Sequence, residues 1–422
     1  MKKYILVVNN ISGVGGAQIY ILRKAKFLEK KGYRIFIISG NANNIKFKEF
    51  YNYKFLEIKE MLFSPNRFSK KQREKIINSF LNFIDYKENN TIFIESHQIY
   101  PSFWGEIFSE KIKCTNLVYC IGPMVIKNKL FNGFFNKKLI FNELLGCNAS
   151  YIADTFGYGY NNNFFNIPFD KNEIKVEHID DKPKGFDLKI LTISRVEKTY
   201  IKQSILDLIE FCKKNPSKKI KYDLVVSKNE GKDFIKLTKI ITNANLENLD
   251  LNISGPLLKL TTSIFENRDI FLGMGTSVLN AVSMNVPALV VDYRNNKYYG
   301  FFGVDHYEFG SAKKKADKNL DFFLYRFLNK EIDIEEIKDK AYSFFLENYE
   351  SDKVNNDFLN YQININKIKN KTYFSFDRKS YDLRAIIETF LVHLFGVEKA
   401  NSIRSYMAKI KNIVKKDKNY FR

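Results

Sequence analysis

The sequence predicts an α/β protein with two doubly wound domains and a helical C-terminal extension. Short apolar runs alternate with helical patterns from residue 4 to about residue 320. A polar segment containing Pro and Gly, residues 180–185, interrupts this alternation and is typical of a linker. Beyond Leu320 only helical patterns remain. Repeated strand–helix alternation on both sides of a linker indicates two parallel sheets covered by helices.

The first half of the chain opens with a complete strand–helix–strand unit. Residues 4–9 are apolar, and we interpret them as a buried first strand because the run is too short for a signal-peptide core. Apolar residues then recur at spacings of three and four from Ile19 to Leu28, which predicts a helix. Two lysines and a glycine at 30–32 end this helix. Further strands are expected at residues 33–39, 91–95, 116–121 and 149–153.

The second half repeats the pattern and then becomes helical. Strands are expected at residues 188–194, 221–226, 249–254, 269–272 and 288–292. Helices are expected at residues 334–348 and 353–368, and an apolar stretch follows at 386–395. The predicted domains are residues 1–182 and 186–350, followed by a helical segment 351–422 that packs back on the first domain or lies on a membrane.

Composition and charge narrow the class of protein. The chain has 422 residues, of which 45% are hydrophobic and 15% aromatic, so it is not disordered as a whole. No apolar run approaches the roughly 18 residues of a spanning helix. The four cysteines form no C-x-x-C pair, which favours a reducing cytosol and argues against structural zinc. The net charge is 68 − 47 = +21. Three explanations are open: contact with nucleic acid, contact with an anionic membrane, or a bias in composition that includes abundant Lys.

A glycine-rich segment, GVGGAQ at 13–18, lies between the first strand and its helix. Glycines there let the backbone approach a ligand, and the helix N-terminus offers N–H groups to a phosphate or sugar oxygen. As a dinucleotide fingerprint the segment fails, because Gln18 replaces the third glycine and no acid follows the second strand. A simple tight turn is the alternative.

Two further candidates follow predicted strands. His97 comes at the end of the strand at 91–95, where ligands of open α/β sheets bind, although a lone His can equally be structural. Arg195 follows the strand at 188–194 and can bind a diphosphate bidentately. Lys202, preferred to Lys198 because it falls inside the helix pattern, adds a point charge. The alternative is a solvated basic surface.

The segment FLGMGTSVLNA at 271–281 is the most specific local signal. Gly273 and Gly275 allow close backbone approach, and Thr276 and Ser277 can cap a helix or bond phosphate oxygens. Asn280 lies on the first turn of the same helix. A purely structural turn is the alternative.

With these segments in order, residues 1–365 resemble a glycosyltransferase of the GT-B fold, in the family 4 group that builds capsule, O-antigen and lipooligosaccharide sugars. The resemblance rests on GGAQ at 15–18, on His97, on SRVE at 194–197 and on GMGTS at 273–277. It implies two Rossmann-like domains facing a cleft, the first on the acceptor side and the second binding the nucleotide sugar.

The resemblance also implies roles for single residues. Gly15 and Gly16 would lie against the donor diphosphate or the acceptor, and His97 would contact the transferred sugar. Arg195 and Lys202 would neutralise the leaving diphosphate. The phosphate and ribose of the donor would be held by Gly275, Thr276, Ser277 and Asn280.

One departure from the family concerns its two motif glutamates. In the register fixed by the glycines, their positions hold Leu272 and Asn280. The Asn280 amide can still accept a bond from a ribose hydroxyl, whereas Leu272 cannot replace a carboxylate that binds sugar. The donor sugar is therefore not specified.

The leading hypothesis is a bacterial transferase at the cytoplasmic face of the plasma membrane, acting on a surface-glycan or lipid-linked acceptor. By resemblance it would be retaining and independent of metal, with no cofactor beyond the nucleotide-sugar donor. The alternative is a catalytically degenerate homologue that serves as a binding or scaffolding subunit. A nicotinamide oxidoreductase is excluded by the failed fingerprint.

Two basic segments predict peripheral contact with an anionic membrane. Residues 124–142 interleave lysines with bulky apolar residues, and residues 371–422 carry 12 basic and 5 acidic residues. An ordinary helix with solvated lysines is the alternative for the first, and a helix packed on the first domain for the second. No nucleic-acid partner is expected, because no nucleic-acid motif accompanies the charge.

Overall fold

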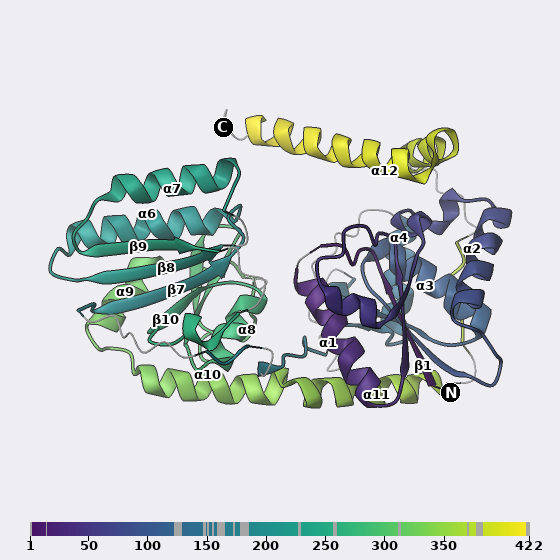
Figure 1. The fold of residues 1–422 in the computed structure, drawn as a ribbon, viewed down its shortest axis with the longest axis horizontal. Coiled ribbons are helices and arrows are strands. Elements are labelled where there is room, and N and C mark those ends of the chain that lie inside the picture. Colours follow the sequence, from purple (N-terminus) through teal and green to yellow (C-terminus); the bar gives the residue numbers. More distant parts are fainter. Residues whose placement is uncertain are drawn as a thin grey trace. The chain divides into compact units, whose positions relative to one another are not determined.

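The computed structural model forms two compact units, shown in Figure 1. Unit 1 comprises Met1–Pro168 and Asp352–Arg422, and unit 2 comprises Phe169–Ser351. The structure describes residues 2–13, 15–121, 129–146, 149, 152–153, 156–157, 165–171, 174–177, 185–226, 229–255, 260–310, 314–368, 371–376 and 383–418, the side chains of 383–385 and 408–418 excepted.

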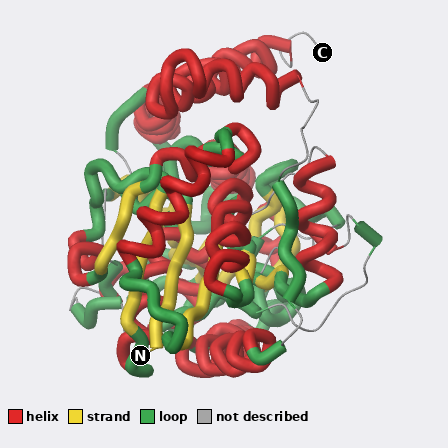
Figure 2. Tube along the Cα trace, turned by 90° about the vertical axis from the view of Figure 1, so that its right-hand side faces the viewer, coloured by secondary structure: helices red, strands yellow, loops and turns green. Residues whose placement is uncertain are grey.

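Unit 1 is built on a six-stranded parallel sheet with the order β3-β2-β1-β4-β5-β6. Its strands are β1 (Lys2–Val8), β2 (Arg34–Ser39), β3 (Lys54–Glu57), β4 (Thr91–Ser96), β5 (Asn116–Tyr119) and β6 (Leu144–Leu145). Its α-helices are α1 (Gly16–Lys30), α2 (Lys70–Phe83), α3 (Ile99–Ile112), α4 (Lys129–Ile140), α11 (Ser351–Asn366) and α12 (Leu383–Lys418). Short 3-10 turns are η1 (Lys48–Asn52), η2 (Lys59–Leu62) and η3 (Pro65–Arg67). Figure 2 shows the strands side by side among helices.

Unit 2 repeats this plan with the order β12-β11-β10-β7-β8-β9. Its strands are β7 (Leu188–Ser194), β8 (Ile220–Val226), β9 (Leu249–Ser254), β10 (Ile270–Gly273), β11 (Ala288–Asp292) and β12 (Lys297–Phe301). Its helices are α6 (Thr199–Lys214), α7 (Lys232–Ala244), η5 (Thr262–Ile264), α8 (Thr276–Ser283), α9 (Leu320–Leu328) and α10 (Ile334–Tyr349). The edge strand β12 pairs antiparallel to β11, and the other pairs are parallel.

Counted from its first strand, each sheet has the doubly wound order 3-2-1-4-5-6. The strand order therefore reverses between β1 and β4 in unit 1 and between β7 and β10 in unit 2. Both faces of the sheets are buried. In β7, Leu188 and Ile190 belong to one core cluster and Leu191 to another. Near-continuous apolar strands are what a parallel sheet covered on both faces requires. The predicted fold class is confirmed.

Most predicted strands and helices are confirmed to within about two residues, but one predicted strand is wrong. The described residues of 149–153, namely Ala149, Ile152 and Ala153, are helical. All three are buried, so their apolar run marks burial rather than a strand. The structure adds β3, β6 and β12, which are four, two and five residues long.

The two units divide the chain between Pro168 and Phe169, before the predicted linker. Phe169 is buried in unit 2, where its N–H donates to the Tyr349 carbonyl. Of the linker itself, only Gly185 lies within the described residues. After Ser351 the chain returns to unit 1, where α11 buries Phe358 against Tyr119, with ring centroids 5.6 Å apart.

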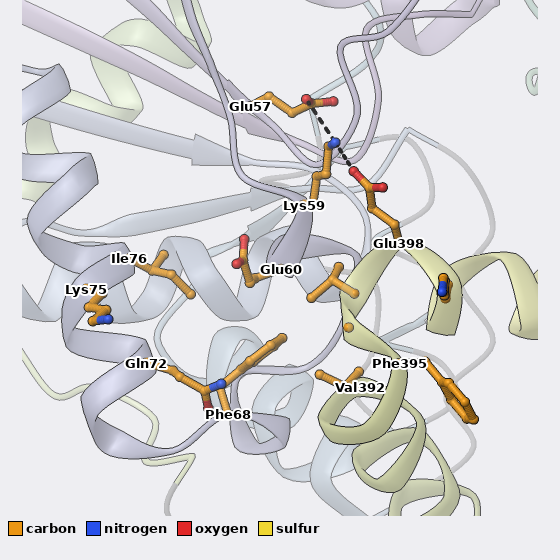
Figure 3. A pocket seen from close by; sticks show the side chains of 13 residues that line it. Glu57, Lys59, Glu60, Phe68, Gln72, Lys75, Ile76, Val392, Phe395 and Glu398 are labelled. Carbon is orange, nitrogen blue, oxygen red and sulfur yellow. Dashed lines mark hydrogen bonds and ion pairs between the residues drawn. The ribbon is translucent and has the colours of Figure 1, made fainter.

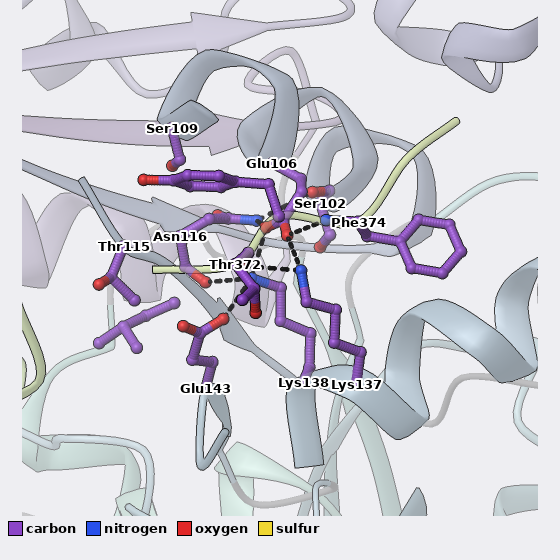
Figure 4. Close-up of polar contacts among 12 residues, drawn as sticks. Ser102, Glu106, Ser109, Thr115, Asn116, Lys137, Lys138, Glu143, Thr372 and Phe374 are labelled. Carbon is purple, nitrogen blue, oxygen red and sulfur yellow. Dashed lines mark hydrogen bonds and ion pairs between the residues drawn. The ribbon is translucent and has the colours of Figure 1, made fainter. Parts of the chain in front are cut away.

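The described part of the basic segment at 124–142 has both buried and exposed side chains. Residues 122–128 lie outside the described part, and the rest is mainly α4. Phe134 and Phe135 are fully buried. Lys138 is buried as well, with Nζ 2.5 Å from Glu106 Oε2 and 2.6 Å from Glu143 Oε2 (Figure 4). Phe134, Phe135 and Lys138 therefore belong to the interior of unit 1, whereas Lys129, Ile140 and Phe141 are exposed, so contact of this segment with a membrane stays a prediction.

No described helix combines the length and apolar character needed to cross a membrane.

Candidate functional site

The four sequence motifs lie at the two places where the strand order reverses. In unit 1, β1 is followed by the glycine segment and β4 by His97. In unit 2, β7 is followed by Arg195 and β10 by the loop 273–277. Ligands of open α/β sheets bind beyond the carboxyl ends of the strands at such switch points. Each unit therefore holds one candidate site.

Arg195 is an accessible cation of the unit 2 site. Its side chain is 63% exposed, and its Nη1 lies 3.7 Å from Oε1 of Glu197, which is also exposed. Exposed ion pairs of this kind contribute little free energy, because water screens both charges. The guanidinium thus remains able to bind an anionic ligand bidentately.

Lys198 is the lysine that the structure brings to the glycine loop. Its Nζ lies 3.6 Å from Sδ of Met274, between the two glycines of that loop. Burial lowers the pKa of Lys198, and the neighbouring charge of Arg195 lowers it further. Lys202, which the sequence favoured, lies exposed in the opening turns of α6. Its role in binding phosphate stays a prediction.

The glycine loop depends on its two glycines for different reasons. A Cβ on Gly273 would lie 2.6 Å from the ring of Phe271, which is fully buried. Gly275 has φ +80°, a left-handed conformation that favours glycine. Its N–H donates to the Phe309 carbonyl at 2.5 Å. This fixes the loop at the entrance to α8.

Helix α8 begins at this loop without a side-chain cap within the described residues. Thr276 and Ser277 occupy its first two positions, and Ser277 Oγ donates to the Met274 carbonyl at 3.1 Å. The Val278 N–H donates to the Gly275 carbonyl at 3.0 Å, so the N–H groups of Thr276 and Ser277 are those that can meet an anion, which the helix dipole favours. Asn280 follows in the next turn and is partly exposed.

The two positions that carry glutamate in the family have different surroundings. Leu272 belongs to β10, is fully buried, and packs in a core cluster of unit 2. Its carbonyl accepts a bond from Thr192 Oγ1 at 2.8 Å. A carboxylate at 272 would thus lie in the core, whereas Asn280 is accessible to a ligand.

Sequence reasoning missed a polar cluster at the end of β11. It lies at the same edge of the sheet as Arg195 and the glycine loop, where the parallel strands end. Arg294 binds the buried Asp292 through both oxygens, with Nε–Oδ1 2.8 Å and Nη2–Oδ2 2.7 Å. Burial alone would raise the pKa of Asp292, but the bonds from Arg294 and Tyr299 hold it well below its usual value. The Tyr299 ring stacks on His306 at 4.2 Å. The signal in the sequence was an acidic residue at the end of a buried strand.

This cluster connects to the glycine loop through the segment after β12. His306 Nε2 lies 2.9 Å from the Gly310 carbonyl, and the intervening Phe309 accepts the Gly275 N–H. Burial lowers the pKa of His306, opposed by the Gly310 carbonyl and by the charge of Asp292. The cluster therefore holds residues 306–310 in place beside the glycine loop that precedes α8.

In unit 1, Gly15 and Gly16 form the turn into α1. Gly15 precedes the helix with extended φ, and Gly16 is its first residue. Gln18 folds back across the turn, its Nε2 donating to the Asn10 carbonyl at 2.9 Å. The residue that replaces the third glycine thus closes the turn.

His97 lies beside this turn but is fully buried. Its N–H donates to the Val7 carbonyl at 2.9 Å, which ties the end of β4 to β1. Its Nε2 is 3.2 Å from Glu95 Oε1, without hydrogen-bond alignment. The ring of Tyr20 meets it edge-on at 5.3 Å. The structure therefore brings His97 to the predicted place but not into contact with solvent.

Glu95 is the centre of a buried charged network that the sequence did not indicate. Tyr4 and Tyr20 both donate to it, and Lys24 Nζ lies 3.8 Å from Oε2. Burial acts to raise the pKa of Glu95, but Lys24, His97 and Tyr4 outweigh burial and lower it to about 2. Burial lowers the pKa of Lys24 to about 8, although Glu95 opposes this.

Among the described residues, no three His, Cys, Asp or Glu side chains gather as a metal site would require. That the reaction needs no metal stays a prediction.

Comparison with known proteins shows which fold the chain shares with solved structures. No protein-family profile and no curated protein sequence matches the chain. A glycosyltransferase from Rickettsia africae is similar in structure, with 14% identity, TM-score 0.62, and coverage of 87% of this chain and 98% of that one. HepE of Anabaena, solved with UDP and glucose, has 12% identity, TM-score 0.53 and coverage of 86% and 99%.

A third similar structure is the lipopolysaccharide outer core galactosyltransferase WaaB, with 13% identity, TM-score 0.51 and coverage of 86% and 99%. At these identities the likeness concerns the fold. Together with the two doubly wound sheets, it identifies the GT-B fold of two Rossmann-like domains.

Proposed function

We propose that this GT-B chain is a glycosyltransferase that moves a sugar from a nucleoside-diphosphate sugar to a surface-glycan or lipid-linked acceptor. One observation carries the proposal: exposed Arg195, partly buried Lys198 and the uncapped start of α8 converge at the switch point of unit 2. Two cations and a helix N-terminus in one place suit a diphosphate. The likeness to HepE, solved with UDP, and to WaaB, a lipopolysaccharide transferase, supports the donor and acceptor classes.

In the proposed reaction, the bond between the sugar C1 and a diphosphate oxygen breaks, the oxygen of an acceptor hydroxyl bonds to C1, and the hydroxyl proton passes to the leaving diphosphate. Negative charge develops on the leaving diphosphate. Arg195 can donate two parallel N–H bonds to it, and Lys198 supplies a compact charge. The first N–H groups of α8 add fixed dipoles. Such prearranged donors stabilise the developing charge without a metal ion.

Unit 1 would bind the acceptor beside the α1 turn and His97. Retention of configuration at C1 and action at the cytoplasmic membrane surface are expected from the resemblance to family 4. The capsule, O-antigen or lipooligosaccharide class of the acceptor rests on the same resemblance.

The first test replaces single cations. Arg195→Ala and Lys198→Ala should each lower transfer from the donor by about 10² to 10³-fold, because each removes a donor to the leaving group. Transfer is measured by mass spectrometry over a panel of nucleoside-diphosphate sugars. Lys213→Ala, an exposed lysine in the last turn of the same helix α6, is the matched control. Near-normal transfer by Arg195→Ala would refute the site.

The same assay distinguishes the two candidate lysines. If Lys198 contacts the diphosphate, Lys198→Ala should also abolish the rise in melting temperature that a nucleoside diphosphate causes. A loss with Lys202→Ala alone would instead support the lysine favoured by the sequence.

The second candidate function is that of a non-catalytic binding or scaffolding subunit. It is favoured by the burial of Leu272 in the core and by Asn280 in place of a glutamate. Binding of a nucleoside diphosphate without hydrolysis or transfer from any donor would support this candidate. Turnover of any donor would exclude it.

A further inference from the structure

Helix α12 consists of two helices that meet at Gly396, where φ is +74° and ψ is +167°. The first, residues 383–395, packs on unit 1 through one face. Val392 is buried there, and buried Glu388 pairs with Arg67 of η3 at 3.5 Å. The position of this helix on the unit is thus fixed by both apolar and charged contacts.

The opposite face of this helix is apolar and exposed. Its large side chains have between 41% and 60% of their surface accessible, and they are Ile386, Ile387, Phe390 and Leu394. Ile386, Phe390 and Leu394 are four residues apart and so form one stripe. Contiguous exposed apolar surface of this kind marks an interaction site.

The charge around the stripe is positive. The only acidic residue among 383–395 is Glu388, which faces Arg67 in the interior. The second helix, residues 397–418, carries seven basic and two acidic residues. One of those two, Glu398, pairs with Lys59. An apolar stripe continued by a basic helix is the pattern of a helix that lies in the surface of an anionic bilayer.

The neighbouring pocket does not explain the stripe. A cavity of about 680 Å³ lies between α2 and α12, with Phe395 on its wall (Figure 3). Lys59, Lys75 and Lys399 line it, but so do Glu57, Glu60 and Glu398. Its charges balance, so it has no preference for an anion, and the outward stripe is a separate surface.

We propose that the first half of α12 docks unit 1 on an anionic lipid bilayer. Ile386, Phe390 and Leu394 enter the boundary between headgroups and acyl chains, and the net positive charge of the second half, seven basic against two acidic residues, attracts the anionic headgroups. This inference rests on the proposed function in that it names the surface by which a transferase acting at a membrane would dock, but its test requires neither a donor nor transfer, so the two can fail separately.

The test is sedimentation of the full chain with vesicles of phosphatidylglycerol and phosphatidylcholine, compared with phosphatidylcholine alone. The wild type should bind the anionic vesicles, and high salt should weaken binding. The variant Ile386→Ser/Phe390→Ser/Leu394→Ser should lose about tenfold or more in affinity, since it removes three inserted side chains. The matched control is Tyr51→Ser/Val176→Ser/Ile235→Ser, which replaces equally exposed apolar residues elsewhere and should bind as the wild type does.

A fluorescence measurement reports on the helix itself. The sole tryptophan, Trp104, is fully buried. In the Phe390→Trp variant, the introduced indole should shift its emission to the blue on adding anionic vesicles. No binding at low salt, or equal binding by the serine variant, would overturn the proposal. A wild-type dimer that the serine variant converts to monomer would also overturn it, because a second copy would then cover the stripe.

Discussion

Among the residues that the sequence selected, Arg195 and His97 differ strongly in solvent accessibility. The Arg195 side chain is 63% exposed and can meet a ligand directly, whereas that of His97 is 1% exposed. His97 lies among Tyr20, Tyr119 and Glu95. Its surroundings are those of a structural histidine as much as of a ligand-binding one. His97 follows the fourth strand of its sheet and Arg195 the first strand of the other, so each lies at a switch point, in a different environment.

The network around Glu95 makes the free energy of unfolding depend on pH. Its pKa is lowered to about 2 in the folded chain, below the usual 4.5. Its stabilising contribution is therefore complete above pH 4.5 and is lost as the pH falls toward 2, about 3 kcal/mol in all. Urea unfolding at successive pH values should show this loss. The variant Lys24→Met/Glu95→Gln should depend less on pH.

Glu210→Gln provides the matched control for this pH series, because Glu210 forms an exposed pair with Lys214 on the surface of α6. It should unfold with the pH dependence of the wild type. An identical acid slope in the wild type and the double variant would contradict a stabilising role of the ionised Glu95.

Restoring the family glutamates should have opposite consequences at the two positions. Leu272→Glu places an unpaired carboxylate in the core and should lower the free energy of unfolding by about 4 kcal/mol or more. Asn280→Glu, at a partly exposed site, should change it by less than about 1 kcal/mol. Thermal unfolding measures both, with Leu272→Met as the conservative control. A stable Leu272→Glu protein would show that position 272 can face a ligand.

At the scale of elements, the turns after β1 and β10 look alike in sequence but differ in structure. The turn after β10 requires its glycines because Phe271 fills the space beside Gly273 and Gly275 has positive φ. At the turn after β1, a Cβ on Gly15 would meet only the flexible end of Gln18, at 3.2 Å. In unit 2, glycine is thus required by packing at Gly273 and by backbone conformation at Gly275, whereas in unit 1 a Cβ on Gly15 would only displace the end of a flexible side chain.

A pair of alanine variants tests this difference. Gly273→Ala should lower stability by about 1–3 kcal/mol, because the buried Phe271 ring must shift. Gly15→Ala should leave stability within about 0.5 kcal/mol of the wild type. Both are measured by thermal unfolding without ligand. Equal losses would mean that the first turn is also fixed by packing.

At the scale of the whole molecule, the chain leaves unit 1 at Pro168, builds unit 2 and returns through α11. The returning helix completes unit 1. Phe358 packs on Tyr119, and the centroid of its ring lies 3.5 Å from Lys24 Nζ. The extended segment 371–376 continues this packing. The Phe374 N–H donates to Glu106 Oε1, beside Lys137 and Lys138, as Figure 4 shows. Unit 1 therefore depends on residues from both ends of the chain.

Calorimetry should show a separate thermal unfolding transition for each unit. Phe358→Ala should lower the stability of unit 1 by about 3–5 kcal/mol and shift one thermal transition. Phe345→Ala is the matched control in unit 2, where the ring is equally buried and packs on Phe169. It should shift the other transition. If both variants moved a single common transition, the two units would be one cooperative body.

The sequence alone determined the fold class, the principal strands and the four segments at the switch points. These follow from local patterns: apolar runs, helical spacing, and glycines between a strand and a helix. The position of Arg195 beyond β7 and of GMGTS beyond β10 could therefore be predicted without coordinates.

The tertiary structure decided what depends on residues distant in the chain. It brought Lys198 to Met274, buried Lys24 and Lys138 in ion pairs, and placed the α12 stripe outward. It also added the short edge strands, which carry too few residues for a periodic signal. A lysine has the same sequence pattern whether solvent or a buried carboxylate surrounds it, so its partner is settled only when distant segments pack together.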